Sequence, residues 1–110
     1  MGTNTAFATV NKSMSPAAAT SGNGSTTGLS LSAAPAVGSY VAVFVNGWMV
    51  WLANGPGEQA AADCYFRRGA DPNAIAYGSF ASGDTLYWNG NNTHFDLVPT
   101  EHYLDFLFGV

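Results

Sequence analysis

Side chains that commonly carry catalysis are sparse in this 110-residue chain. Of its two histidines, His102 would point away from the adjacent Glu101 on a strand, because successive side chains alternate between faces. Hydroxyl groups are plentiful, yet the sequence has no nucleophile-elbow, phosphate-loop or dinucleotide motif. Spacing alone identifies no catalytic pair of carboxylates. The sequence therefore predicts a protein that is not an enzyme, with no catalytic residues and no cofactor.

Metal centres and reactive thiols have equally weak signals. Cys64 is the only cysteine, so we expect neither an internal disulfide nor a zinc site of the usual spacing. In the segment DCYFR it alternates with Phe66, which favours a buried, inert thiol over a reactive one. Calcium prefers oxygen ligands, which four residues in or beside turns could supply: Asp71, Asn73, Asp84 and Asp96. Asp and Asn in turns more often cap the backbone, so we predict no metal site.

The aromatic side chains are the remaining candidates for binding. The tryptophans Trp48, Trp51 and Trp88 and five tyrosines could form a flat face that stacks on a sugar ring. Alternatively, they fill a hydrophobic core and a subunit interface, where Trp and Tyr are enriched. The second interpretation is favoured, because hydrophobic strand-like segments surround most of these rings.

The low charge of the chain limits its partners. Charged residues make up 9% of the chain, far below the roughly 25% usual for soluble domains, so we expect a homo-oligomer that buries part of the surface. Lys12 is the only charged residue before residue 40, and beyond residue 57 Arg67 and Arg68 stand against seven carboxylates. Clustered basic residues are absent, so we predict no binding to nucleic acid or to a membrane surface. We also expect no secretory signal and no membrane span.

A change in composition divides the chain at residue 28. Residues 1–28 are rich in Ala, Ser, Thr, Gly and Asn, with too few large apolar groups to offset their own ordering entropy. Two interpretations stay open, a flexible tail and an extended arm that becomes ordered on a neighbour. Phe7, Val10 and Met14 are isolated apolar anchors that favour the arm. Residues 29–110 are expected to form the folded body.

Short strand-like segments alternate with turn signals throughout residues 29–110, and no segment predicts a helix. The segments YVAVFV and WMVWLA are joined by Asn46-Gly47, which is typical of a type I′ hairpin. Both faces of YVAVFV are apolar, which predicts cover on both sides. In the last segment, EHYLDFLF, the side chains of Leu104, Phe106 and Phe108 share a face. Other strands are expected at GLSLS, DCYFR, AIAYGSF and DTLYWN, with EQAAAD as a loop or single turn and HFDLV as a strand or corner.

This pattern predicts an all-β fold. We expect a small antiparallel β-sandwich or jelly-roll-like domain of seven to eight strands, preceded by the extended N-terminal arm. A core of this size is marginal without a disulfide or a metal, so oligomerisation is the expected source of additional stability.

The order of motifs resembles a group of short virion structural proteins from tailed bacteriophages. The resemblance covers about residues 26–108, and its sharpest parts are VFVNG at residues 43–47 and GDTLYWNG at residues 83–90. The segments DCYF and HYLDFLF also fit. After the YF pair, however, this chain has Arg67-Arg68-Gly69-Ala70-Asp71-Pro72, where the family has a Ser and a Gly-rich turn. The role of that loop therefore stays open.

The resemblance implies a capsid decoration, or cement, protein on the outer capsid surface. Such a protein stabilises the phage head by bridging copies of the major capsid protein, often as a trimer, with residues 1–28 as the docking arm. The alternative is a tail-fibre or host-attachment module that binds carbohydrate through exposed tryptophans, and a secreted structural domain of a cell is a third hypothesis. The candidate interface residues are Phe7, Val10, Trp48, Trp51, Phe106 and Phe108.

Overall fold

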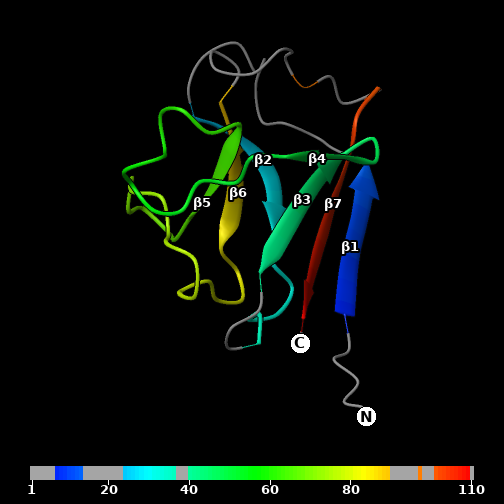
Figure 1. Cartoon of the computed structure of the whole chain (residues 1–110), viewed down its shortest axis with the longest axis horizontal. Helices are drawn as coiled ribbons and strands as arrows, with labels where there is room; N and C mark the ends of the chain where they lie inside the picture. The colour runs from blue at the N-terminus through cyan, green and yellow to red at the C-terminus, as the bar shows by residue number, and fades with distance from the viewer. Residues whose placement is uncertain (1–6, 14–23, 37–39, 90–96, 98–100, 110) are drawn as a thin grey trace.

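The described part of the chain consists of two antiparallel sheets (Figure 1). The computed structural model describes residues 7–13, for which only the backbone is considered, and residues 24–36, 40–89, 97 and 101–109. Sheet A has the strand order β1-β7-β3-β4, and sheet B has the order β2-β6-β5. The described residues contain no helix, so the prediction of an all-β fold is confirmed. The strands are β1 (Phe7–Ser13), β2 (Ser25–Ser30), β3 (Val41–Val45), β4 (Trp48–Val50), β5 (Cys64–Arg67), β6 (Thr85–Trp88) and β7 (Tyr103–Gly109).

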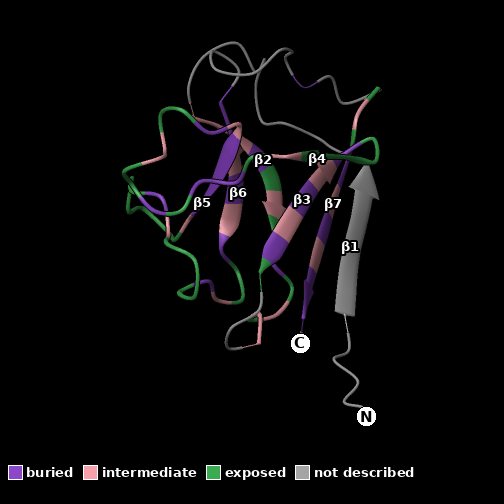
Figure 2. Cartoon of the chain, in the orientation of Figure 1, coloured by how far each residue is buried: buried purple, intermediate pink, exposed green. Residues whose placement is uncertain are grey.

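The two sheets share one hydrophobic core. Val43 of β3 and Phe106 of β7 are fully buried in sheet A, and Phe66 and Leu86 are fully buried in sheet B. The rings of Phe66 and Phe106 meet edge to face, with centroids 5.5 Å apart, and this contact joins the sheets. Figure 2 shows buried and partly buried positions alternating along β3, as expected for a strand with one face toward the core. With a radius of gyration of 13.3 Å, the chain is compact.

The predicted hairpin between β3 and β4 is confirmed. Asn46 and Gly47 both have positive φ, 50° and 84°, as a type I′ turn requires. Val45 pairs with Trp48 directly across this turn. On the other face of β3, Ala42 and Phe44 are partly buried. The face toward the core is thus fully covered, whereas the second face has partial cover among the described residues.

The segment AIAYGSF is not a strand, which corrects the prediction made for it. It forms turns, and its only backbone bond to a strand is from the Ile75 N–H to the Phe66 carbonyl at 2.9 Å. Gly78 has a φ of 84°, which interrupts an extended conformation. The strands expected at DCYFR, DTLYWN and EHYLDFLF are present as β5, β6 and β7, and EQAAAD forms a turn. Of HFDLV, only the buried Leu97 is described.

Two strands include residues of the polar N-terminal segment. β1 pairs with β7 of the same chain, with Phe7 opposite Gly109 and Val10 opposite Phe106. β2 begins at Ser25, so the predicted boundary at residue 28 falls inside a strand. Beyond these observations, the division into an arm and a body stays a prediction.

Candidate interaction surface

The structure places the predicted interface residues in different environments. Trp48 and Trp51 are at the surface, with 78% and 46% of their area exposed. Phe106 and Phe108 are fully buried in the chain's own core and present no surface to a partner. Phe7 and Val10 lie on β1, for which only the backbone pairing with β7 is described. Their side chains lie outside the described part of the structure.

Trp48 is exposed because it begins a short strand at the edge of sheet A. Its cross-strand partner Val45 is buried, but β4 has no further strand beside it among the described residues. A groove of about 230 Å³ lies beside it, lined by Val45, Asn46, Trp48, Val50 and His102. This volume is below the about 300–1,000 Å³ of typical small-molecule sites. The groove suits a single inserted side chain better than a whole ligand.

Trp51 lies where the chain leaves sheet A for sheet B. Its backbone N–H donates to Asp63 Oδ2 at 2.7 Å, and its carbonyl accepts the N–H of Cys64 at 3.1 Å. The next residue, Leu52, forms an isolated parallel bridge with Cys64. The Trp51 indole Nε1–H donates to Glu58 Oε1 at 3.4 Å. Trp51 therefore has a structural role in joining the sheets, in addition to its exposed area.

Sheet A also has an outward-facing apolar surface. We call this the outer face of sheet A, and strand alternation assigns to it Ala42, Phe44, Met49, Tyr103, Asp105 and Leu107. Met49 and Tyr103 are 68% and 56% exposed. In the middle of this face, Asp105 has one carboxylate oxygen, Oδ1, that is buried and has no hydrogen-bond partner. Met49 was not among the candidates predicted from the sequence, whereas Tyr103 is one of the five tyrosines considered for sugar stacking.

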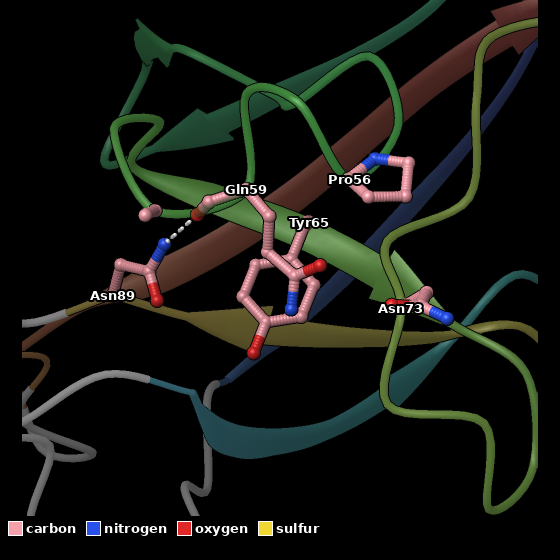
Figure 3. A pocket seen from close by; sticks show the side chains of 6 residues that line it. Pro56, Gln59, Tyr65, Asn73 and Asn89 are labelled. Atoms are coloured by element: carbon pink, nitrogen blue, oxygen red, sulfur yellow. Dashed lines mark hydrogen bonds between the residues drawn. The ribbon is translucent and has the colours of Figure 1, made fainter.

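The outer face of sheet B is covered by loops and holds a second pocket (Figure 3). This pocket has a volume of about 340 Å³ and is lined by Pro56, Gln59, Ala60, Tyr65, Asn73 and Asn89. The Gln59 amide is fully engaged, because Oε1 accepts the Ala74 N–H at 2.7 Å and Nε2 donates to the Pro72 carbonyl at 3.0 Å. Asn89 Nδ2 donates to the carbonyls of Gln59 and Ala62. These amides hold the loops together, which leaves few free donors for a ligand.

Aromatic rings on sheet B are packed against one another. Tyr65 and Tyr87 stack with centroids 5.7 Å apart, and the Arg67 guanidinium lies 4.4 Å from the Tyr87 centroid. Tyr65 is 4% exposed, so its ring offers no face to a sugar. This part of the structure agrees with the core interpretation of the aromatic residues.

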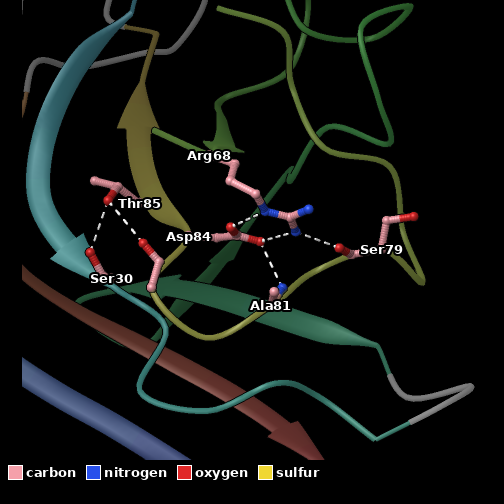
Figure 4. Close-up of polar contacts among 7 residues, drawn as sticks. Ser30, Arg68, Ser79, Ala81, Asp84 and Thr85 are labelled. Atoms are coloured by element: carbon pink, nitrogen blue, oxygen red, sulfur yellow. Dashed lines mark hydrogen bonds and ion pairs between the residues drawn. The ribbon is translucent and has the colours of Figure 1, made fainter. Parts of the chain in front are cut away.

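An ion pair fixes the loop that follows β5 (Figure 4). Arg68 Nε and Nη2 donate to the two carboxylate oxygens of Asp84, each at 2.9 Å. Asp84 is 1% exposed and also accepts the Ala81 N–H at 2.7 Å, while Arg68 donates to the Ser79 carbonyl. The hydrogen bonds to Asp84 raise the pKa of Arg68, and the negative charge of Asp84 adds a smaller increase. The arrangement has a structural role, since it ties two turns to the start of β6.

Two of the oxygen-bearing turn residues, Asp71 and Asp84, and the thiol of Cys64 are engaged in the fold. Asp71 Oδ1 accepts the Asn73 N–H at 2.9 Å, which is the backbone capping expected of turn residues. The described residues hold no group of three or more His, Cys, Asp or Glu side chains arranged for a metal, and Asp96 lies outside them. Cys64 is buried as predicted, and burial, with a smaller contribution from Asp63, raises the pKa of its thiol well above the usual value.

Comparison with known proteins identifies no relative of this chain. No protein-family model, curated protein or solved structure matches it. Within its described residues, the chain has no helix that is long and apolar enough to cross a membrane.

Proposed function

We propose that this chain is a non-enzymatic virion structural protein, a decoration protein that binds the outer surface of a phage head and bridges major capsid proteins. The observation that carries the proposal is the exposed apolar edge of sheet A, where Trp48 and Met49 are 78% and 68% exposed. In a chain with only 9% charged residues, such a surface favours burial against other proteins. The resemblance of the motifs over residues 26–108 supports a phage head as the particle to which the chain binds.

We also propose that the two sheets form a small antiparallel β-sandwich. The shared core and the Phe66–Phe106 contact support this arrangement. An oligomer, with a trimer as the form expected from the resemblance, would repeat the same contacts around a symmetry axis. Repetition over a shell would turn weak individual contacts into strong overall binding.

A second candidate function, carbohydrate binding in host attachment, is favoured by one observation. Trp48 presents most of its ring to solvent beside a shallow groove, as a sugar-stacking residue would. The remaining lining residues do not favour it, because both groups of the Asn46 amide are engaged: Nδ2 donates to the Glu101 carbonyl and Oδ1 accepts the Tyr103 N–H. The groove therefore has few polar groups with which to orient a sugar.

Binding to purified phage heads that lack this protein distinguishes these functions. We expect the chain to bind such heads, and we expect Trp48→Ala to weaken the binding at least tenfold. Tyr40→Ala is the matched control, since Tyr40 is 77% exposed at the opposite end of β3. A cryo-electron-microscopy map of the decorated particle should show the chain at capsomer junctions. Density confined to tail fibres, together with glycan binding that Trp48→Ala abolishes, would replace the decoration function with host attachment.

A further inference from the structure

We propose that the outer face of sheet A docks a partner protein whose apolar contact surface brings a lysine or arginine side chain to Asp105. The inference rests on the proposed function in one respect, that this face contacts another protein. What it adds is the chemistry of that partner.

The face has the apolar composition of a contact surface. In the register of sheet A, Phe44 stands opposite both Met49 and Asp105, and Ala42 stands opposite Leu107. Apolar side chains thus form a continuous surface across three neighbouring strands, β4, β3 and β7. Met49 and Tyr103 are the exposed members of this surface, and Ala42, Phe44 and Leu107 are partly buried. An apolar surface of this kind on a small protein favours an interaction site.

Asp105 is the one charged residue that the described strands place on this face. Its Oδ1 atom is buried without a hydrogen-bond partner, which is costly for a carboxylate among apolar groups. Oδ1 itself is shielded, but the residue as a whole is only partly buried, so a cation placed over the face can approach its exposed part and offset the carboxylate charge. A partner that supplies a charged donor there removes the penalty, and the charge then selects that partner.

The chain's arginines do not supply this cation. Arg68 is paired with Asp84, and Arg67 lies over the Tyr87 ring, so both are engaged on sheet B. On β1, the residue that stands opposite Asp105 is Asn11. Lys12 stands opposite Leu104 rather than opposite Asp105. No described side chain therefore supplies the cation, and we assign it to the partner.

A second copy of this chain is a poor occupant of the face. Two such faces brought together would enclose two Asp105 carboxylates in one apolar contact, and the described residues of the face offer no basic side chain to pair with them. Like charges in an apolar contact oppose binding. The charge pattern therefore favours a different protein with a basic residue flanked by apolar ones.

Selection from a random peptide library against the purified full chain tests the proposal directly. We expect enrichment of peptides that combine large apolar residues with one lysine or arginine. Selection against Asp105→Asn should keep the apolar pattern and lose the basic residue. For the best peptide, Asp105→Asn should weaken binding about tenfold or more, and Met49→Gln should also weaken it.

The control is Glu101→Gln, which makes the same change in net charge outside the face and should leave binding unchanged. Asp105→Asn should also raise the thermal midpoint of the free protein, because it removes an unpaired charge; a purely structural aspartate would show the opposite shift. Enriched peptides without a basic residue, no enrichment, or equal effects of Glu101→Gln and Asp105→Asn would overturn the proposal. So would self-association in sedimentation experiments that Met49→Gln abolishes.

Binding to phage heads separates this inference from the proposed function. If the chain selects basic apolar peptides but does not bind heads, the decoration function fails and the inference stands. If wild type and Asp105→Asn bind heads equally well, the function stands and the inference fails.

Discussion

The turn residue Asn46 should contribute to stability in two separable ways. Its side chain joins the hairpin to the start of β7 and to the segment just before it. Nδ2 donates to the Glu101 carbonyl at 2.9 Å, and Oδ1 accepts the Tyr103 N–H at 2.8 Å. Its backbone has a φ of 50°, which asparagine tolerates better than other residues with a Cβ. Substitution by glycine removes only the side-chain bonds, whereas substitution by alanine also introduces backbone strain.

The magnitudes follow from these contacts. Two solvent-exposed hydrogen bonds are worth about 1–2 kcal/mol together. The greater freedom of glycine in the unfolded chain adds about 0.5 kcal/mol, so Asn46→Gly should cost about 2 kcal/mol. Alanine at positive φ costs about 1–2 kcal/mol instead, so Asn46→Ala should cost about 3 kcal/mol. These losses correspond to falls in thermal midpoint of about 8 °C and 12 °C.

Denaturant and thermal unfolding followed by tryptophan fluorescence measure both variants. Gly47→Ala is the matched control, because Gly47 has a φ of 84° and open space around the position of an added Cβ. It should show the backbone strain without any lost side-chain bond. Wild-type stability of Asn46→Gly would refute a contribution from the side chain, and Asn46→Ala more stable than Asn46→Gly would refute the backbone argument.

Three further substitutions test the core, the thiol and the buried carboxylate of Asp84. Phe106→Ala should lower the free energy of unfolding by about 3–5 kcal/mol in denaturant titrations, whereas the exposed Met49→Ala should change it by less than about 0.5 kcal/mol; similar losses would contradict the assigned burial. Because burial raises the pKa of the Cys64 thiol, stability should be complete below about pH 8.5 and fall at higher pH, as the unfolded chain releases a proton that the folded chain keeps. Cys64→Ala should lack this loss, and an equal loss in that variant would contradict it. Asp84→Ala should cost about 1–3 kcal/mol, because the partly buried Ala81 N–H loses its acceptor, and an unchanged thermal midpoint would exclude that role.

Local features of the fold were predictable from the sequence because they depend on neighbouring residues. Asn46-Gly47 predicted a tight hairpin, since few other residue pairs tolerate two consecutive positive φ angles. The alternation of Leu104, Phe106 and Phe108 placed them on one face of a strand, and all three are buried. The burial of Cys64 followed from the same alternation in β5.

Other features depended on contacts between distant segments. AIAYGSF has the composition of a weak strand, but Ile75 makes one bond to β5 and the chain turns away at Gly78. Trp51 carries the chain from one sheet to the other, which no local pattern indicated. The Asp71 carboxylate caps a turn by accepting the Asn73 N–H, whereas Asp84 binds Arg68, which lies 16 residues away in the chain.

The turns and the strand periodicity follow from the order of neighbouring residues alone, and the low charge follows from the composition. Which apolar residues face inward depends on how the strands pair and pack. Phe106 and Phe108 belong to the core because β7 lies between β1 and β3 and faces Phe66 of sheet B. Trp48 and Met49 are exposed because β4 is an edge strand of sheet A, with β3 as its only neighbour among the described strands. Alternation defines two faces of a strand, but which face is buried depends on pairing between residues as far apart as Phe7 and Gly109.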